Sequence, residues 1–163
     1  MSVASWQFGL FALVAALVYN AVNHGGWRQA VLLVANLAFL STFASGGAAG
    51  FVPFAGFIAA GYAFVWITQA SGNPRLGWAL IGSTVLLFFW LKHYVFIPAA
   101  LWLPGPYVVI GLSYIFFRVL QVQIDATQGG LKQAPRPVTY LNYLLNFSTL
   151  ISGPIQRYEE FTA

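Results

Sequence analysis

Apolar stretches of 14 to 21 residues follow one another along the whole chain, each closed by Gly, Pro, Asn or one of the few charges. A helix of roughly 20 apolar residues crosses the hydrocarbon core of a bilayer. Six such stretches occur, at residues 6–19, 29–43, 51–69, 77–97, 107–124 and 138–151. We therefore expect an all-α, polytopic integral membrane protein with about six transmembrane or partly re-entrant helices, forming a single membrane domain over residues 1–163.

The composition supports a membrane protein and excludes several other classes. About 65% of the residues are apolar when Gly is counted and Tyr is not, against roughly 45–50% in a soluble domain. Seven Lys and Arg against three Asp and Glu give a net charge of +4, too sparse for a face that binds nucleic acid. With no cysteine and only two histidines, the chain offers no thiolate or multi-histidine metal site.

The basic residues predict the orientation of the chain, because short cytoplasmic loops are enriched in Lys and Arg. The first, third and fifth loops carry Arg28, Arg75, and Lys132 with Arg136, whereas the second and fourth carry none. We expect the odd-numbered loops in the cytoplasm and the N-terminus on the outer side of the plasma or inner membrane. Residues 1–5 contain no Lys or Arg, so we expect the first stretch to be a retained anchor instead of a cleaved signal peptide.

The polar residues of the fifth stretch share one helical face. Tyr114, Arg118, Gln121 and Asp125 stand at positions i, i+4, i+7 and i+11, over about 16 Å of helix. A charge at the centre of a span costs about 2.5–3.5 kcal/mol on insertion scales, so this stripe must face protein or trapped water. Two interpretations stay open: the stripe lines a polar passage, or it belongs to a network that locks helices together.

Two other segments carry polar residues near the membrane. Lys92 and His93 are adjacent on the fourth stretch, near the predicted outer interface, where the Lys92 side chain can reach the water. The sixth stretch, residues 138–151, is only about 21 Å long against a core of about 30 Å, so we expect a tilted, partial or protein-buried helix. It holds Asn146 and is followed by Gln156 and Arg157, whose donors can meet exposed carbonyls or an anionic ligand.

At this last segment the sequence resembles the membrane-bound O-acyltransferase family, in the branch that acetylates exported polysaccharides or transfers D-alanine to cell-wall polymers. The family's Gly-Pro-Ile turn, Arg-Tyr pair and later aromatic are matched by Gly153, Pro154, Ile155, Arg157, Tyr158 and Phe161. A Gly-Ile-Ser-Phe pattern, then Phe, then Asp at the end of the same helix is similar to Gly111-Leu112-Ser113-Tyr114, Phe117 and Asp125. An aromatic cluster around a lysine resembles residues 89–96, with Lys92 as the lysine.

The resemblance implies an enzyme that moves an acyl group, most simply acetyl, from a cytoplasmic donor such as acetyl-CoA or an acyl-carrier protein to an extracytoplasmic hydroxyl. Its catalytic histidine lies in a later part of the family's sequence, and neither His24 nor His93 takes its place. The resemblance thus assigns no catalytic residue and no bound cofactor or metal to this chain, which we expect to be inactive without a C-terminal half or an accessory secreted or periplasmic acyltransferase.

The residues that we expect to line a tunnel or contact substrate are Lys92, Ser113, Tyr114, Arg118, Gln121, Asp125, Asn146, Gln156 and Arg157. The chain departs from the family at Val122, where the family usually has tyrosine, and at His93, where it has an aromatic residue. The alternative is a non-enzymatic integral membrane scaffold or accessory subunit, in which the same polar residues serve helix packing.

Overall fold

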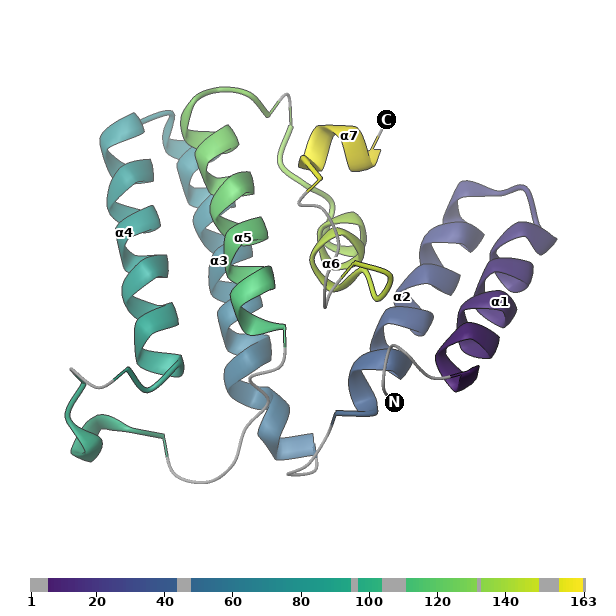
Figure 1. The fold of residues 1–163 in the computed structure, drawn as a ribbon. Helices are drawn as coiled ribbons and strands as arrows, with labels where there is room; N and C mark the ends of the chain where they lie inside the picture. Colours follow the sequence, from purple (N-terminus) through teal and green to yellow (C-terminus); the bar gives the residue numbers. More distant parts are fainter. Residues whose placement is uncertain are drawn as a thin grey trace. The chain divides into compact units, whose positions relative to one another are not determined.

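A computed structural model describes residues 6–43, 48–94, 97–103, 111–131, 133–149 and 156–162. All regular elements in these ranges are helical, which confirms the predicted all-α class. They are α1 (Trp6–Ala21), α2 (Gly25–Ser41), η1 (Ala48–Phe51), α3 (Val52–Ser71), α4 (Pro74–Leu91), η2 (Ala99–Leu101), α5 (Leu112–Thr127), α6 (Pro137–Leu145) and α7 (Tyr158–Thr162) (Figure 1). They form two compact units: α1, α2 and α6 make unit 1, and the other elements make unit 2.

The ends of the helices follow from local backbone chemistry. Gly72 ends α3 in the left-handed conformation, at φ +58°, which glycine adopts without steric cost. Asn73 caps α4 by accepting a hydrogen bond from the Arg75 backbone N–H at 3.0 Å, and Pro74 supplies the first residue of that helix. The turn predicted between the third and fourth stretches is therefore present, although Arg75 lies inside the helix.

The fourth and sixth predicted stretches are longer than the helices that they form. Helix α4 ends at Leu91 instead of Ile97, with Lys92 as its C-cap. Helix α6 has only 9 residues, about 14 Å, and five of these are buried, as expected for a partial, protein-buried helix. Its C-cap is Asn146, whose Oδ1 accepts hydrogen bonds from the Ser148 backbone N–H and hydroxyl, at 3.3 and 2.8 Å.

Two helical segments of the described chain are long and apolar enough to cross a membrane. Residues Ala49–Ser71 have a mean hydropathy of 1.7 and Pro74–Leu91 of 1.4 in their most apolar windows. Only 33% and 22% of those windows are buried inside the structure, unlike the core helix of a soluble protein. The other four predicted spans stay predictions.

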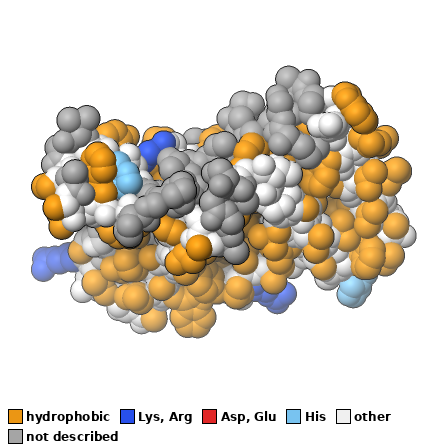
Figure 2. All heavy atoms as spheres, turned by 90° about the horizontal axis from the view of Figure 1, so that it is seen from below, with side chains coloured by type: hydrophobic (Ala, Val, Ile, Leu, Met, Phe, Trp, Pro, Cys, Tyr) orange, Lys and Arg blue, Asp and Glu red, His pale blue; other side chains and the backbone are white. Residues whose placement is uncertain are grey.

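Large apolar side chains cover the outward faces of the helices. Trp6 is 76% exposed on α1 and Leu86 is 70% exposed on α4, and Trp66 and Trp78 are each about half exposed. Figure 2 shows apolar side chains over most of the described surface in view, with scattered basic ones and no acidic one among the described residues of that face. Exposed apolar area on this scale is typical of a surface that meets lipid or a partner.

Unit 2 is built on helices α3, α4 and α5, each of which packs against the other two. Phe88 of α4 stacks on Phe116 of α5, with ring centroids 4.0 Å apart. Val65 of α3 and Ile115 of α5 are fully buried in this core. Gly77 lies at a close approach, because a Cβ there would stand 2.5 Å from the Thr127 hydroxyl oxygen.

Unit 1 is built on α2, which packs against both α1 and α6. The α1–α2 hairpin is closed by the Trp27 indole N–H, which donates to the Val18 carbonyl at 2.9 Å. At the other end of the hairpin, five phenylalanine rings form a cluster in which contacting centroids lie 5.2 to 6.3 Å apart; its members are Phe8, Phe11, Phe39, Phe43 and Phe147. Phe147 joins this cluster from the segment after α6.

Candidate functional site

The candidate site is the polar stripe of α5 in unit 2, with Arg118 at its centre. Gly111 starts α5 as a left-handed N-cap, at φ +71°, and Asp125 lies in the last turn of the helix. Arg118 is only 2% exposed, and its guanidinium carbon stands 4.8 Å from the centroid of the Tyr114 ring, one turn earlier. The charge expected to turn away from lipid is thus buried and held over an aromatic face.

Asp125, at the end of the stripe, lies within electrostatic reach of two charged residues near α7, Arg157 and Glu159. Burial raises the pKa of the Asp125 carboxyl above its ordinary 3.8, the charge of Arg157 lowers it, and that of Glu159 raises it. Two predicted site residues, one on α5 and one just before α7, therefore interact electrostatically. The neighbouring Tyr158 is buried, and burial, with a smaller effect of Tyr62, raises its pKa.

The other predicted site residues are more scattered. Ser113 and Gln121 are half-buried on α5, and Gln121 makes no hydrogen bond to Arg118 or Asp125 within the described part of the chain. Lys92 is half-buried at the end of α4, where the ring of His93 stacks on Trp102 at 4.8 Å. Gln156 is exposed before α7, and Asn146 belongs to unit 1. The turn at residues 153–155 lies outside the described residues.

A second polar contact on α5 was missed by the sequence interpretation. Gln123 is buried and donates through Nε2 to the Thr84 hydroxyl of α4 at 2.9 Å. Thr84 in turn donates to the Leu80 carbonyl at 3.1 Å. The sequence offered only a neutral polar residue on an apolar helix. Such a residue does not by itself indicate whether its side chain meets a partner on another helix.

Unit 1 has a buried amide pair that was also missed. Asn36 of α2 donates to the Asn142 side-chain oxygen of α6 at 3.2 Å, and its own oxygen accepts from the Phe147 backbone N–H at 2.9 Å. Asn142 also donates to the Gln29 carbonyl at 2.9 Å. These bonds join α2 to α6 and stabilise the packing of the two helices.

The described residues of the stripe can bind and orient a polar group, and neither histidine of the chain is among them. His24 lies in the turn of the α1–α2 hairpin and His93 beyond the end of α4, and neither is on α5. Among the described residues, no group of three or more His, Cys, Asp or Glu is placed to hold a metal ion.

Comparison with protein-family models, with curated proteins and with solved structures finds no match to this chain.

Proposed function

We propose that this chain is the N-terminal membrane portion of an O-acyltransferase in the cell membrane. The complete enzyme passes an acyl group, most simply acetyl, from a cytoplasmic thioester donor to a hydroxyl of an exported polysaccharide or cell-wall polymer. The chain forms part of the wall of the passage, and a C-terminal part or an accessory extracytoplasmic acyltransferase supplies the base. The sequence motifs around Gly111, Asp125 and Arg157 support this proposal.

The observation that carries the proposal is the buried Arg118. A guanidinium in an apolar helix is tolerated only where protein or water surrounds it, and such residues commonly mark substrate or ion pathways. Its contact with Tyr114 fixes the guanidinium on the same helical face as Asp125.

The test compares the chain alone with the chain and the polypeptide encoded directly after it, both in membranes supplied with labelled acetyl-CoA. We expect label in polysaccharide only when both polypeptides are present, because the histidine that serves as the base in the resembled family has no counterpart in this chain. Transfer by the chain alone would contradict that division of labour. Absence of transfer from both together would contradict the acyltransferase proposal.

The variant Arg118→Leu distinguishes between two roles of Arg118, lining a passage and packing helices together. If Arg118 lines a passage, the variant folds, with an unchanged gel-filtration profile in detergent, but loses about 100-fold in transfer. Arg75→Gln is the matched control, because Arg75 is an exposed arginine at the start of α4 and should leave both readouts unchanged.

The second candidate function is that of a non-enzymatic scaffold, and the interhelical bonds favour it. Gln123 with Thr84, and Asn36 with Asn142, are neutral polar pairs of the kind that hold membrane helices together. Under this function Arg118→Leu misassembles, and its gel-filtration profile changes together with any loss of activity.

A further inference from the structure

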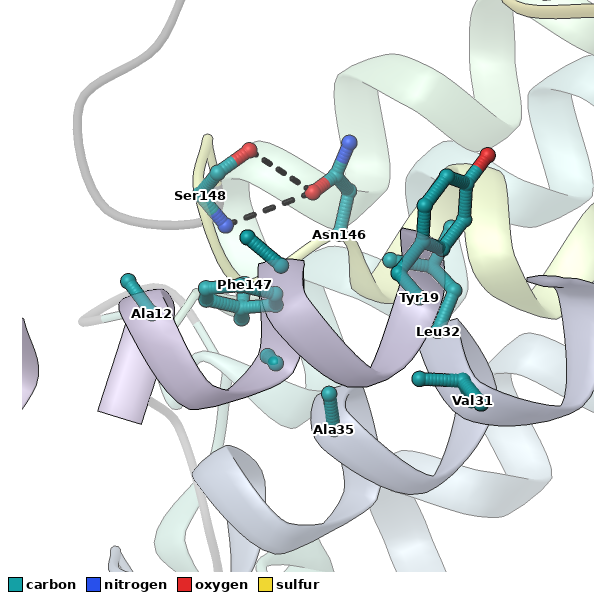
Figure 3. A pocket seen from close by; sticks show the side chains of 10 residues that line it. Ala12, Tyr19, Val31, Leu32, Ala35, Asn146, Phe147 and Ser148 are labelled. Carbon is teal, nitrogen blue, oxygen red and sulfur yellow. Dashed lines mark hydrogen bonds between the residues drawn. The ribbon is translucent and has the colours of Figure 1, made fainter. Parts of the chain in front are cut away.

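Unit 1 contains a pocket of about 290 Å³, at the lower end of the roughly 300–1,000 Å³ typical of ligand pockets (Figure 3). Its walls come from small or apolar residues of the hairpin: Ala12, Ala15 and Ala16 on α1, and Val31, Leu32 and Ala35 on α2. The pocket exists because these positions carry alanine, since a longer side chain there would fill it. The walls suit a flexible hydrocarbon chain.

Hydrogen-bond donors lie beside these apolar walls. The Asn146 oxygen already accepts both bonds from Ser148, so its amide nitrogen is left as a donor, and Figure 3 shows that nitrogen pointing away from Ser148. Tyr19 lies on the same helical face as Ala12 and Ala16, and it adds a hydroxyl at the end of the pocket nearest the hairpin turn. A ligand with an acceptor at this end would find partners.

Arg28 adds a positive charge at the same end. It lies in the first turn of α2, on the face that continues through Leu32 and Ala35, and its guanidinium carbon stands 5.3 Å from the centroid of the Tyr19 ring. Within the described part of the chain its Nε is buried and has no hydrogen-bond partner. The sequence of unit 1 contains no Asp or Glu, so this charge has no counter-ion within its unit.

We propose that unit 1 binds an anionic phospholipid, with the headgroup at Arg28 and one acyl chain in the alanine-lined pocket. The charge complementarity selects an anion, and the apolar groove, which continues from Tyr19 to Ala12 over about 10 Å of helix, selects an amphiphile. The predicted cytoplasmic position of the hairpin turn places Arg28 at the leaflet where anionic lipids gather. The inference rests on the membrane placement in the proposed function and not on acyl transfer.

Native mass spectrometry of the full chain in detergent tests this inference, by titration with phosphatidylglycerol and with phosphatidylcholine of the same acyl chains. We expect a 1:1 complex that forms about fivefold more tightly with phosphatidylglycerol, the contribution of one arginine near an anionic headgroup. Glycerol phosphate, which lacks acyl chains, should not displace the lipid. Equal affinity for the two lipids, or displacement by glycerol phosphate, would overturn the proposal.

Three variants locate the site. Arg28→Gln should reduce the affinity for phosphatidylglycerol to that for phosphatidylcholine, whereas Arg28→Lys should keep the preference for phosphatidylglycerol. Ala15→Leu should lower the affinity for both lipids, because the larger side chain fills the pocket. Arg75→Gln, which removes an exposed arginine of unit 2, is the matched control and should change nothing. An equal loss in Arg75→Gln and Arg28→Gln would refute the site.

The two proposals fail separately. If acyl transfer is observed but the lipid preference is absent, the inference about unit 1 is wrong and the proposed function stands. If the preference is present without transfer, the lipid site stands and the acyltransferase proposal is wrong.

Discussion

At the scale of single residues, the buried amide of Gln123 is satisfied on one side only. Its Nε2 donates to Thr84, whereas its Oε1 is buried and has no hydrogen-bond partner within the described part of the chain. Thr84 does not depend on this contact, because its hydroxyl also bonds the Leu80 carbonyl. Removing the Thr84 hydroxyl therefore leaves the buried Gln123 amide without a partner, whereas removing the Gln123 amide leaves the Thr84 hydroxyl bonded to Leu80.

We predict opposite outcomes for the two partners. Thr84→Val should destabilise the protein by about 1–3 kcal/mol, because both polar atoms of the buried Gln123 side chain then lack partners. Gln123→Leu should be neutral or slightly stabilising, because it also removes the unpaired Oε1. Thermal unfolding of both variants in the same detergent measures the difference, and a larger loss in Gln123→Leu than in Thr84→Val would contradict this reasoning.

At the scale of helices, unit 2 depends on the close approach of α4 to its neighbours at Gly77. A Cβ at this position would stand 2.8 Å from Thr127 Cγ2 and 3.0 Å from Thr68 Cγ2, in addition to its contact with the Thr127 hydroxyl. Thr127 is held in place, because its hydroxyl donates to the Gln123 carbonyl at 2.8 Å. Small residues at such contacts let membrane helices pack closely.

Gly77→Ala should destabilise unit 2 by about 1–3 kcal/mol, because the added methyl group displaces Thr127 or separates the helices. Gly82→Ala on the same helix is the control: nothing lies within 4 Å of its Cβ position, and the higher helix propensity should stabilise by up to about 1 kcal/mol. Thr127→Ala combined with Gly77→Ala should recover part of the loss. Equal unfolding temperatures for the two glycine variants would show that the contact is unimportant.

The helices were predictable from the sequence to the extent that local chemistry defines them. The pair Asn73-Pro74 marks the start of α4 because both residues act within one turn. The early end of α4 at Leu91 was not predictable from hydropathy, since the next residues are equally apolar apart from Lys92 and His93. His93 adopts φ +51° and stacks on Trp102, a contact between residues in different segments.

The same distinction applies to the candidate site. Arg118 was predictable as an inward residue because a charge in an apolar helix has few alternatives. Asn36 and Gln123 were not, because a neutral amide is acceptable on several faces and its importance depends on the partner that it meets. That partner for Asn36 is Asn142, 106 residues later in the chain.

At the scale of the whole molecule, the absence of cysteine makes the topology directly measurable. Single cysteines placed at exposed positions react with a membrane-impermeant maleimide only from the side on which they lie. Asn23 and Gln133 are exposed residues of the first and fifth loops, and Leu101 is 60% exposed in the fourth. These three positions sample both predicted sides of the membrane.

In intact cells or spheroplasts we predict labelling of Leu101→Cys, and labelling of Asn23→Cys and Gln133→Cys only after permeabilisation. The physical reason is the retention of Arg28, Arg75 and Arg136 on the cytoplasmic side. The opposite labelling pattern would show that the topology is the inverse of the predicted one. Recovery of the protein in the supernatant after alkaline carbonate extraction would contradict membrane integration altogether.

Unit 1 takes its helices from two parts of the chain that are separated by residues 44–135 of unit 2. A ribosome adding about 5–20 residues per second therefore makes α2 about 5–18 s before α6 emerges. During that interval the Asn36 amide has neither Asn142 nor the Phe147 N–H available. A nascent hairpin with an unsatisfied amide is a substrate for insertases and quality-control proteases, so the order of synthesis gives this fold a period of vulnerability that the finished protein no longer has.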